Sequence, residues 1–270
     1  METKEQRKGE KLERGVCWLR RDLRLNDHHA LSQAMTQCHN VLLLFILDKN
    51  ILHNIRKVAQ DYDPSAFDHN DLLPDKRIEF ILKNLRELQK ELENKGGTLY
   101  VRTGRPEEII PSFCQQMQVD ALFFNRDYEP YARQRDEKIK KALIKTGLNV
   151  QEFKDHVIFE AHEIQKNQGG DYRVFTPYKK KWLEVFERSF NGAPLPQYPC
   201  RNFKKVLFPL SHEQQKKERL NIQENMTQLG LACDHLTIKT GTRYAQNKLQ
   251  HFSQKKLSSY DIKKDFPALG

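Results

Sequence analysis

The chain has 270 residues, of which 38% are hydrophobic and 30% are charged. This length suits one large domain or two ordinary ones, and the composition excludes a disordered chain, a collagen-like repeat and a small disulfide-rich scaffold. The net charge of +10 lies mostly in residues 151–270, which hold 20 Lys and Arg against 13 Asp and Glu. A nucleic-acid surface, where one exists, is therefore expected after residue 150, although solvated basic faces explain the charge more simply.

The cysteines and the apolar runs bear on the compartment of the protein. The five cysteines are scattered and form no C-x-x-C pair, which is typical of reduced thiols in a cytoplasmic protein. The longest uninterrupted apolar run, Val41–Leu47, is too short to cross a membrane, so no membrane association is expected. Residues 1–14 lack the apolar segment of a signal peptide and are expected to form a disordered leader.

Strand and helix patterns alternate through the first part of the chain. Short apolar runs, of the kind found in a sheet buried on both faces, predict five strands at residues 16–19, 41–47, 99–101, 121–124 and 150–153. Helical patterns between them predict a helix capped by Asp27 and running to Gln37, and further helices over 78–92, 106–117 and 130–146. The alternation predicts an α/β fold with a doubly wound, five-stranded parallel sheet over residues 15–153, strand one being central. Residues 49–73 interrupt the rhythm and are expected to form a long loop.

The strand signals stop after residue 153. Residues 154–212 are interpreted as a connecting segment that contains one helix, starting at Pro177, and an extended linker over 191–210. Two more helical patterns, near 214–229 and 241–257, suggest that residues 213–270 begin a helical domain.

Charged side chains follow two of the predicted strands at the edge where open parallel sheets bind ligands. They are Arg20-Arg21-Asp22-Leu23-Arg24 after the first strand and Asn125-Arg126-Asp127-Tyr128-Glu129 after the fourth. Two interpretations stay open: a polar pocket for a planar or anionic ligand, or Arg–Asp pairs that only pin the loops. The neighbouring His28-His29 pair is interpreted as surface or loop packing, and no glycine-rich phosphate loop or serine nucleophile elbow is present.

Four ordered motifs resemble those of the DNA photolyase/cryptochrome family. They are Cys17–Asp27 with Ala30-Leu31, then Asn125–Ala132 with Arg135-Asp136, then Tyr172–Tyr178 with Lys181-Trp182, and finally Tyr260 with Lys264-Asp265-Phe266-Pro267. The Arg20-Arg21-Asp22 sequence, where DASH cryptochromes usually carry an Asn in the middle, favours the photolyase branch. Leu19, His28 and Lys264 depart from residues that are common in the family.

The resemblance implies a Rossmann-like photolyase antenna domain, a linker and the first helices of an all-α FAD domain. It implies a light-dependent flavoenzyme that splits pyrimidine dimers in damaged DNA by electron transfer from photoexcited reduced FAD. Two cofactors follow, FAD and an antenna chromophore that is either a folate (MTHF) or a deazaflavin. Among the residues that match family positions, Tyr260 is implied for FAD, and Arg21, Asp22, Asp127 and Glu129 are implied for the antenna.

The resemblance also leaves other roles open. The chain ends before the flavin-binding motifs of the family, so the isolated chain is expected neither to retain FAD nor to repair DNA. A monomer is expected, with a separate C-terminal half as a possible partner. The alternatives are a cryptochrome-type blue-light sensor and an isolated chromophore-binding module that never meets DNA.

Overall fold

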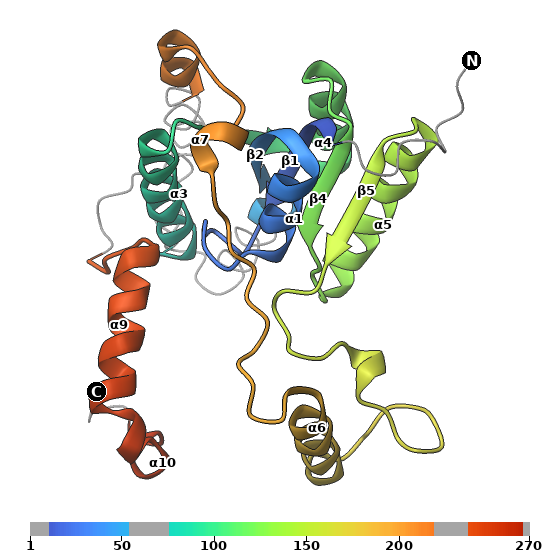
Figure 1. Ribbon diagram of the computed structural model, residues 1–270, viewed down its shortest axis with the longest axis vertical. Helices are drawn as coiled ribbons and strands as arrows, with labels where there is room; N and C mark the ends of the chain where they lie inside the picture. The colour runs from blue at the N-terminus through green and yellow to red at the C-terminus, as the bar shows by residue number, and fades with distance from the viewer. Residues whose placement is uncertain (1–10, 54–75, 219–236, 267–270) are drawn as a thin grey trace, which may run out of the picture. The chain divides into compact units, whose positions relative to one another are not determined.

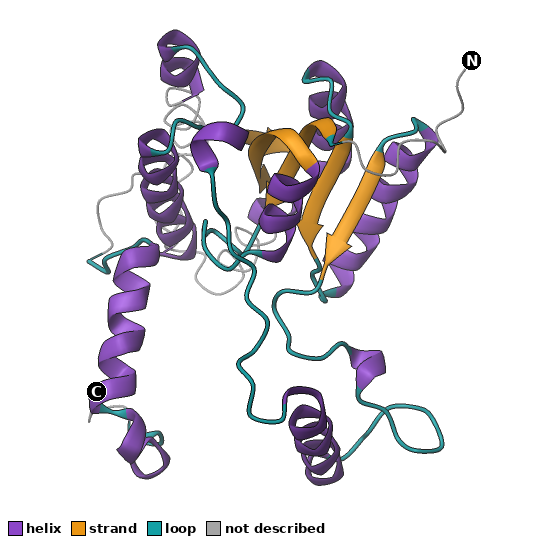
Figure 2. Ribbon diagram, in the orientation of Figure 1, coloured by secondary structure: helices purple, strands orange, loops and turns teal. Residues whose placement is uncertain are grey.

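The computed structural model of the chain describes residues 11–53, 76–218 and 237–266. Figure 1 traces the chain and Figure 2 separates its helices from its strands. In chain order the elements are β1 (Leu12–Leu19), α1 (His29–Gln37), β2 (Cys38–Asp48), α3 (Lys76–Asn94), β3 (Leu99–Gly104), α4 (Pro106–Gln116), β4 (Ala121–Asn125), α5 (Pro130–Lys145), β5 (Asn149–Phe153), η3 (Ala161–Glu163), α6 (Phe175–Phe190), α7 (Phe203–Val206), α9 (Thr242–Lys255), η4 (Leu257–Ser259) and α10 (Tyr260–Lys263).

The predicted sheet is confirmed as a five-stranded parallel sheet in the order β3-β2-β1-β4-β5, with β1 at its centre. In the register of β1 with β4, Gly15 lies opposite Ala121 and Cys17 lies opposite Phe123. The next pairing sets Asn125, the last residue of β4, opposite Phe153, the last residue of β5. The carboxyl ends of β1, β4 and β5 therefore meet at one edge, where the charged motifs begin.

The chain divides into two compact units, residues 1–44 with 106–208 and residues 45–105 with 209–270. In the first unit α1 covers one face of β1 and β4, while α4 and α5 pack together behind the strands (Figure 1). The second half of β1 and the whole of β4 are buried and mostly apolar on both faces, and Trp18, Phe123 and Phe124 are among the largest fully buried side chains.

In the second unit, α3 and β3 are joined through a buried side chain. The amide of Gln89 on α3 donates to Thr98 Oγ1 at 2.8 Å and its oxygen accepts the backbone N–H of Leu99 at 2.7 Å. Helix α9 begins where the N–H of Gly241 donates to Asn84 Oδ1 at 3.0 Å. Helix α9 and the residues that follow it carry exposed apolar side chains, namely Leu249, Leu257, Tyr260, Ile262 and Phe266.

Several boundaries differ from those expected. Strand β1 begins at Leu12, inside the expected leader, because the backbone N–H of Arg14 bonds Asp120 Oδ2 at 2.9 Å. Residues 49–53 of the expected long loop are helical, and its remainder lies outside the described residues, as does most of the helix expected near 214–229. No helix of the described residues is long and apolar enough to cross a membrane.

The expected cap of helix α1 was wrong. The N-cap is His28, whose ring accepts the backbone N–H of Leu31, whereas Asp27 adopts a left-handed backbone with φ of 48°. The carboxylate of Asp27 accepts the N–H of Tyr198 at 2.9 Å instead, so it serves the linker and not the helix.

Gly15 is required by close packing between β1 and the start of β2. A Cβ at this position would lie 2.6 Å from Cys38 Sγ and 3.0 Å from Cε2 of Phe123. We expect Gly15→Ala to lower the free energy of unfolding by about 1–3 kcal/mol, measured by urea denaturation. Adding Cys38→Ala removes the closer atom and is expected to restore part of the loss. If the stability losses of Gly15→Ala and Cys38→Ala simply add in the double variant, this packing argument is contradicted.

Candidate functional site

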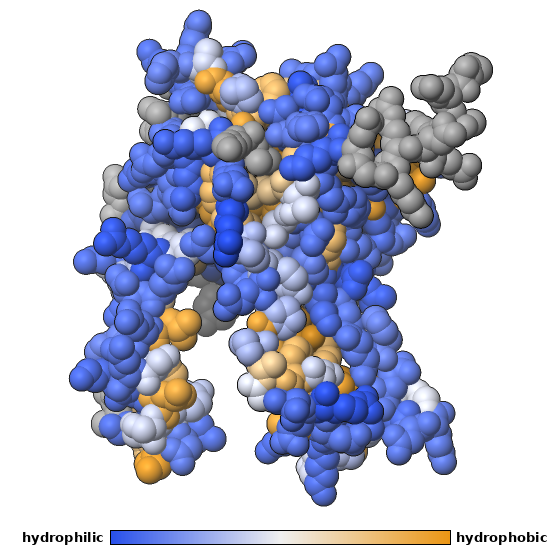
Figure 3. All heavy atoms as spheres, in the orientation of Figure 1, coloured by the Kyte–Doolittle hydropathy of each residue, from blue (hydrophilic) through white to orange (hydrophobic). Residues whose placement is uncertain are grey.

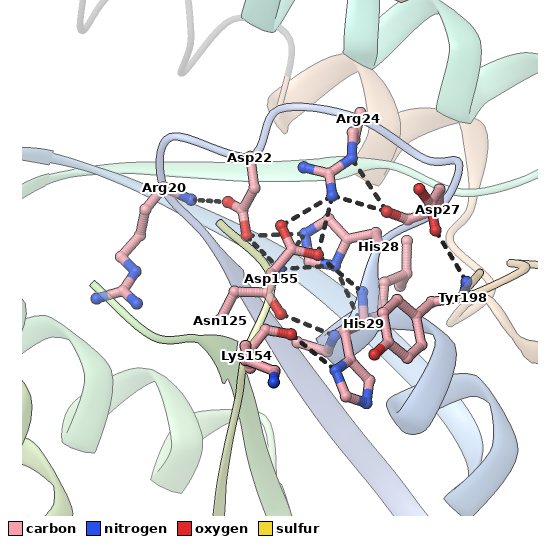
Figure 4. A network of polar contacts seen from close by, with 12 residues as sticks. Arg20, Asp22, Arg24, Asp27, His28, His29, Asn125, Lys154, Asp155 and Tyr198 are labelled. Atoms are coloured by element: carbon pink, nitrogen blue, oxygen red, sulfur yellow. Dashed lines mark hydrogen bonds and ion pairs between the residues drawn. The ribbon is translucent and has the colours of Figure 1, made fainter. Parts of the chain in front are cut away.

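The loops that follow β1 and β4 are joined by a buried contact between Asp22 and Asn125 (Figure 4). The amide Nδ2 of Asn125 donates to Asp22 Oδ2 at 2.7 Å, and the Oδ1 of Asn125 accepts the backbone N–H of Ala30 at 3.0 Å. Both side chains are almost fully buried. Asn125 therefore links the end of β4 to the β1 loop and to the first turn of α1.

The carboxylate of Asp22 accepts hydrogen bonds from three directions. Besides Asn125, the backbone N–H of Arg20 donates to Oδ1 at 2.7 Å and Nε2 of His28 lies 3.0 Å from Oδ2. Burial raises the pKa of Asp22, but the hydrogen bonds from His28, Arg20 and Asn125 outweigh it and hold the pKa well below its usual range. The buried carboxylate is therefore ionised and is held by donors from its own loop, from the cap of α1 and from the end of β4.

His28 is fully buried, so of the two interpretations given for the His28-His29 pair, surface or loop packing, His28 fits loop packing. Its Nδ1 accepts the N–H of Leu31 at 3.1 Å, which assigns the proton to Nε2, the atom that faces Asp22. One imidazole thus caps α1 and also binds the β1 loop. A local sequence pattern could not show this, because histidine is not a usual cap and its partner Asp22 lies on the other side of the loop.

A second set of contacts ties the connecting segment to the same loop (Figure 4). Arg24 Nη2 donates to both carboxylate oxygens of Asp155, at 2.9 and 2.8 Å. His29 bonds the carbonyl of Lys154 through Nδ1 at 2.9 Å, and its ring stacks on Tyr198 with centroids 3.7 Å apart. The segment thus leaves the sheet near Asp155 and returns at Tyr198, held at both points by the β1 loop and the start of α1.

Arg20 leaves the loop toward helix α5. Its Nη1 pairs with Asp136 Oδ2 at 2.6 Å, and its guanidinium lies over the ring of Trp18 at 4.8 Å. Arg135 also lies over Trp18 at 4.8 Å and contacts the other oxygen of Asp136. For Arg20 and Arg24, the interpretation of Arg–Asp pairs that pin loops is therefore confirmed.

Arg21 differs from its neighbours, because its side chain is 56% exposed. It joins two residues of the β4 loop, with Nη2 2.6 Å from Glu129 Oε1 and Nε 3.6 Å from Asp127 Oδ2. The hydrogen bond to Glu129 and the charge of Asp127 raise the pKa of Arg21. The Asp127 side chain is 10% exposed, whereas that of Glu129 is 61% exposed. These three residues form a charged rim above the buried Asp22–Asn125 contact.

Of the five residues expected at cofactor sites, Arg21, Asp127 and Glu129 thus lie together. Asp22 is buried and is the neighbour of Arg21 in the chain. Tyr260 belongs to the second unit, where it is 52% exposed and contacts the ring of Phe252 edge-on at 5.6 Å. Sequence reasoning missed Asp155 and Tyr198, which carry no local signal because their partners are distant in the chain. Among the described residues, no group of three or more His, Cys, Asp or Glu could hold a metal ion.

The fold and the charged rim agree with a comparison against known families. A model of the DNA photolyase family matches residues 15–199. The chain belongs to the DNA photolyase family. The match covers β1 from Gly15 onward, the β4 loop and the linker as far as Tyr198. It therefore includes every residue of the rim and of the buried network, by which we mean Arg20, Asp22, His28 and Asn125.

Similar proteins include other DNA photolyases. A deoxyribodipyrimidine photo-lyase of Synechococcus is 29% identical over 257 residues, which cover 94% of this chain and 48% of that protein. A bacterial class III photolyase from Agrobacterium tumefaciens has a similar structure with a TM-score of 0.64, at 24% identity over 98% of this chain and 49% of that one. An archaeal photolyase from Sulfolobus tokodaii, whose structure holds two FAD molecules, has a TM-score of 0.58 at 21% identity, over 88% of this chain and 46% of its own. The chain spans about half the length of these relatives.

The two parts of this photolyase site should respond differently to loss of a carboxylate. Asp22→Ala leaves the buried donors of Arg20, Asn125 and His28 without an acceptor, and we expect it to lower the free energy of unfolding by about 3 kcal/mol. Asp127→Ala removes a 3.6 Å contact to an exposed guanidinium and is expected to cost less than about 1 kcal/mol. Urea denaturation at neutral pH measures both, and equal losses would contradict the division into buried network and rim.

The buried carboxylate of Asp22 also predicts that stability depends on pH. Because the pKa of Asp22 is lower in the folded chain than the usual value of about 3.9, its stabilising contribution is present above about pH 4 and is lost as the pH falls further. Compared with Asp22→Asn, the unmodified chain should therefore lose more unfolding free energy between pH 6 and about pH 3. A difference between the two chains that stays constant over this range would contradict the assignment.

Proposed function

We propose that this chain is the antenna-bearing part of a light-dependent DNA repair flavoenzyme that acts on pyrimidine dimers. In such an enzyme, bound reduced FAD supplies the electron that opens the dimer, and an antenna chromophore supplies absorbed light energy. We place the protein in the cytoplasm, as a monomer with damaged DNA as its partner. Membership of the photolyase family supports the general activity, and the geometry of the rim supports the assignment of the antenna.

The observation that carries the antenna assignment is the alignment of Arg21 with Asp127 and Glu129. A pterin or deazaflavin ring presents N–H donors beside carbonyl acceptors along one edge. Asp127 supplies a nearly buried acceptor, while the exposed guanidinium of Arg21 supplies donors next to it. The residues present therefore fit a planar heterocycle of this kind, and they lie at the edge where doubly wound sheets bind ligands.

The strengths of the two rim contacts indicate how a ring would enter. Arg21 is held by Glu129 at 2.6 Å but lies 3.6 Å from Asp127, beyond a good hydrogen bond. A ligand N–H can therefore donate to the carboxylate of Asp127 without breaking the ion pair between Arg21 and Glu129. Asp22 is almost fully buried and already accepts three hydrogen bonds, so we assign it to positioning Arg21, its neighbour in the chain.

The described residues do not build a flavin site by themselves. Tyr260 offers a single exposed hydroxyl on a four-residue helix, and a dinucleotide phosphate requires several convergent donors. We therefore derive no step at FAD from this chain, and we assign FAD and dimer binding to the remaining half of a photolyase.

Chromophore retention tests the antenna assignment. The chain is refolded or expressed with a folate, a deazaflavin or FAD, desalted and assayed by absorption for the bound chromophore. We expect the folate or the deazaflavin to be retained and FAD to be lost on desalting. Asp127→Ala should weaken binding of the retained chromophore by about tenfold or more, because a charge-assisted hydrogen bond is lost. Glu137→Ala, which removes an exposed carboxylate of α5, is the matched control and should leave binding unchanged.

Three outcomes would contradict the proposal. Equal retention by Asp127→Ala and the unmodified chain would remove the rim as the antenna site. A flavin bound in one-to-one ratio and insensitive to Asp127→Ala would show that this chain holds FAD elsewhere. Light-dependent loss of dimers from DNA by the chain alone would likewise overturn the assignment of repair to the remaining half. A full-length protein that binds chromophore without affinity for irradiated DNA would instead be a blue-light sensor or an isolated antenna module.

A further inference from the structure

The first turns of α6 and the residues before them carry exposed aromatic and basic side chains. Phe175 is 73% exposed and Tyr178 is 38% exposed, and Tyr172 contacts Tyr178 edge-on with ring centroids 6.2 Å apart. Three cations accompany them, and we call the whole set the aromatic-basic face: Tyr172, Arg173, Phe175, Tyr178, Lys179 and Lys180. Figure 3 shows hydrophobic and strongly hydrophilic residues side by side over α6.

The packing of α6 does not account for this face. The helix packs through Trp182, Phe186 and Phe190, whose rings contact one another or Phe159 at centroid distances of 5.0–6.1 Å. Val185 is its buried residue. The aromatic residues at its start lie outside this cluster, and a large exposed aromatic patch on a soluble protein marks a contact surface.

The charge around the face is not neutralised locally. Within the described part of the chain, no carboxylate pairs with Arg173, Lys179 or Lys180, whereas the next lysine, Lys181, pairs with Glu184 at 2.8 Å. The first turn of α6 has no acidic residue, and its N-cap Val174 has no side chain that could accept a hydrogen bond. The positive end of a 16-residue helix thus adds to the three cations.

We propose that the aromatic-basic face binds nucleic acid with unstacked bases, the bases stacking on Phe175 and Tyr178 and the phosphates pairing with Arg173, Lys179 and Lys180. Flat exposed rings beside unpaired cations are the chemistry of single-strand binding, because every base has a face to stack and every linkage carries a negative charge. The exposed large apolar side chains of α9 to α10 are mostly aliphatic, namely Leu249, Leu257 and Ile262, and they fit this partner less well. The inference rests on the proposed function only in taking a nucleic acid as the partner.

Binding of a labelled oligo-dT of about 12 nucleotides to the 270-residue chain tests the proposal, followed by fluorescence anisotropy over a range of salt concentrations. We expect Phe175→Ala and Tyr178→Ala each to weaken binding by about tenfold. Lys179→Ala with Lys180→Ala should reduce the salt slope by about 1.4, at about 0.7 for each phosphate contact. A duplex of the same length should bind more weakly than the single strand, because its bases are already stacked.

A matched pair on α5 provides the control. Lys138→Ala with Lys141→Ala removes the same charge from exposed positions and should leave the affinity within about twofold. Equal weakening by both lysine pairs, no effect of Phe175→Ala, or equal affinity for duplex and single strand would overturn the proposal. Preference for anionic vesicles over the oligonucleotide would overturn it in favour of a membrane surface.

The two proposals can fail separately. Loss of chromophore binding in Asp127→Ala, with unchanged oligonucleotide binding, supports both. Oligonucleotide binding by a chain that retains no chromophore would refute the antenna assignment and leave the aromatic-basic face in place. Because Phe175 is largely exposed, its replacement should not alter folding, and circular dichroism of the variant confirms this.

Discussion

The hydrogen bond from the Asn125 amide to the buried carboxylate of Asp22 is the contact on which the candidate site depends. Strands β1 and β4 are neighbours in the sheet, so their loops emerge side by side, but adjacency alone does not fix two polar loops. The 2.7 Å contact does so, and His28 completes it by binding the same carboxylate while capping α1. Because three residues hold the ionised carboxylate of Asp22, the backbone of the neighbouring residue Arg21 is positioned before any ligand binds.

The three arginines that follow β1 therefore have two different roles. Arg20 and Arg24 point to carboxylates that anchor α5 and the connecting segment, and Arg21 between them points to the exposed rim. The loop after β1 bends at Arg20 and Arg21, and these successive side chains bind different partners, Asp136 and Glu129. The residues with the strongest pairing hold the fold, while the residue with the loosest contact, Asp127 at 3.6 Å, keeps acceptor capacity for a ligand.

Much of the fold could be predicted from the sequence, because apolar strands and amphipathic helices leave local periodic signals. The presence of five parallel strands, the central position of β1 and the extent of α5 follow from those signals and from the rules for parallel sheets. The cap of α1 could not be predicted, since His28 acts only where Asp22 meets it and Asp27 is taken by Tyr198. Local patterns also could not separate Asp22 from Asp127, because burial depends on contacts between distant segments.

A double-mutant cycle on Asp22 and Asn125 tests the central claim most directly. The unfolding free energy of Asp22→Ala, Asn125→Ala and the double variant is measured against the unmodified chain, with chromophore retention followed in each. If the contact joins the two loops, the double variant should lose little more stability than the worse single variant, with a coupling energy of about 1–3 kcal/mol, and every variant should retain less chromophore. Stability losses that simply add, or full retention of chromophore in the double variant, would contradict the account.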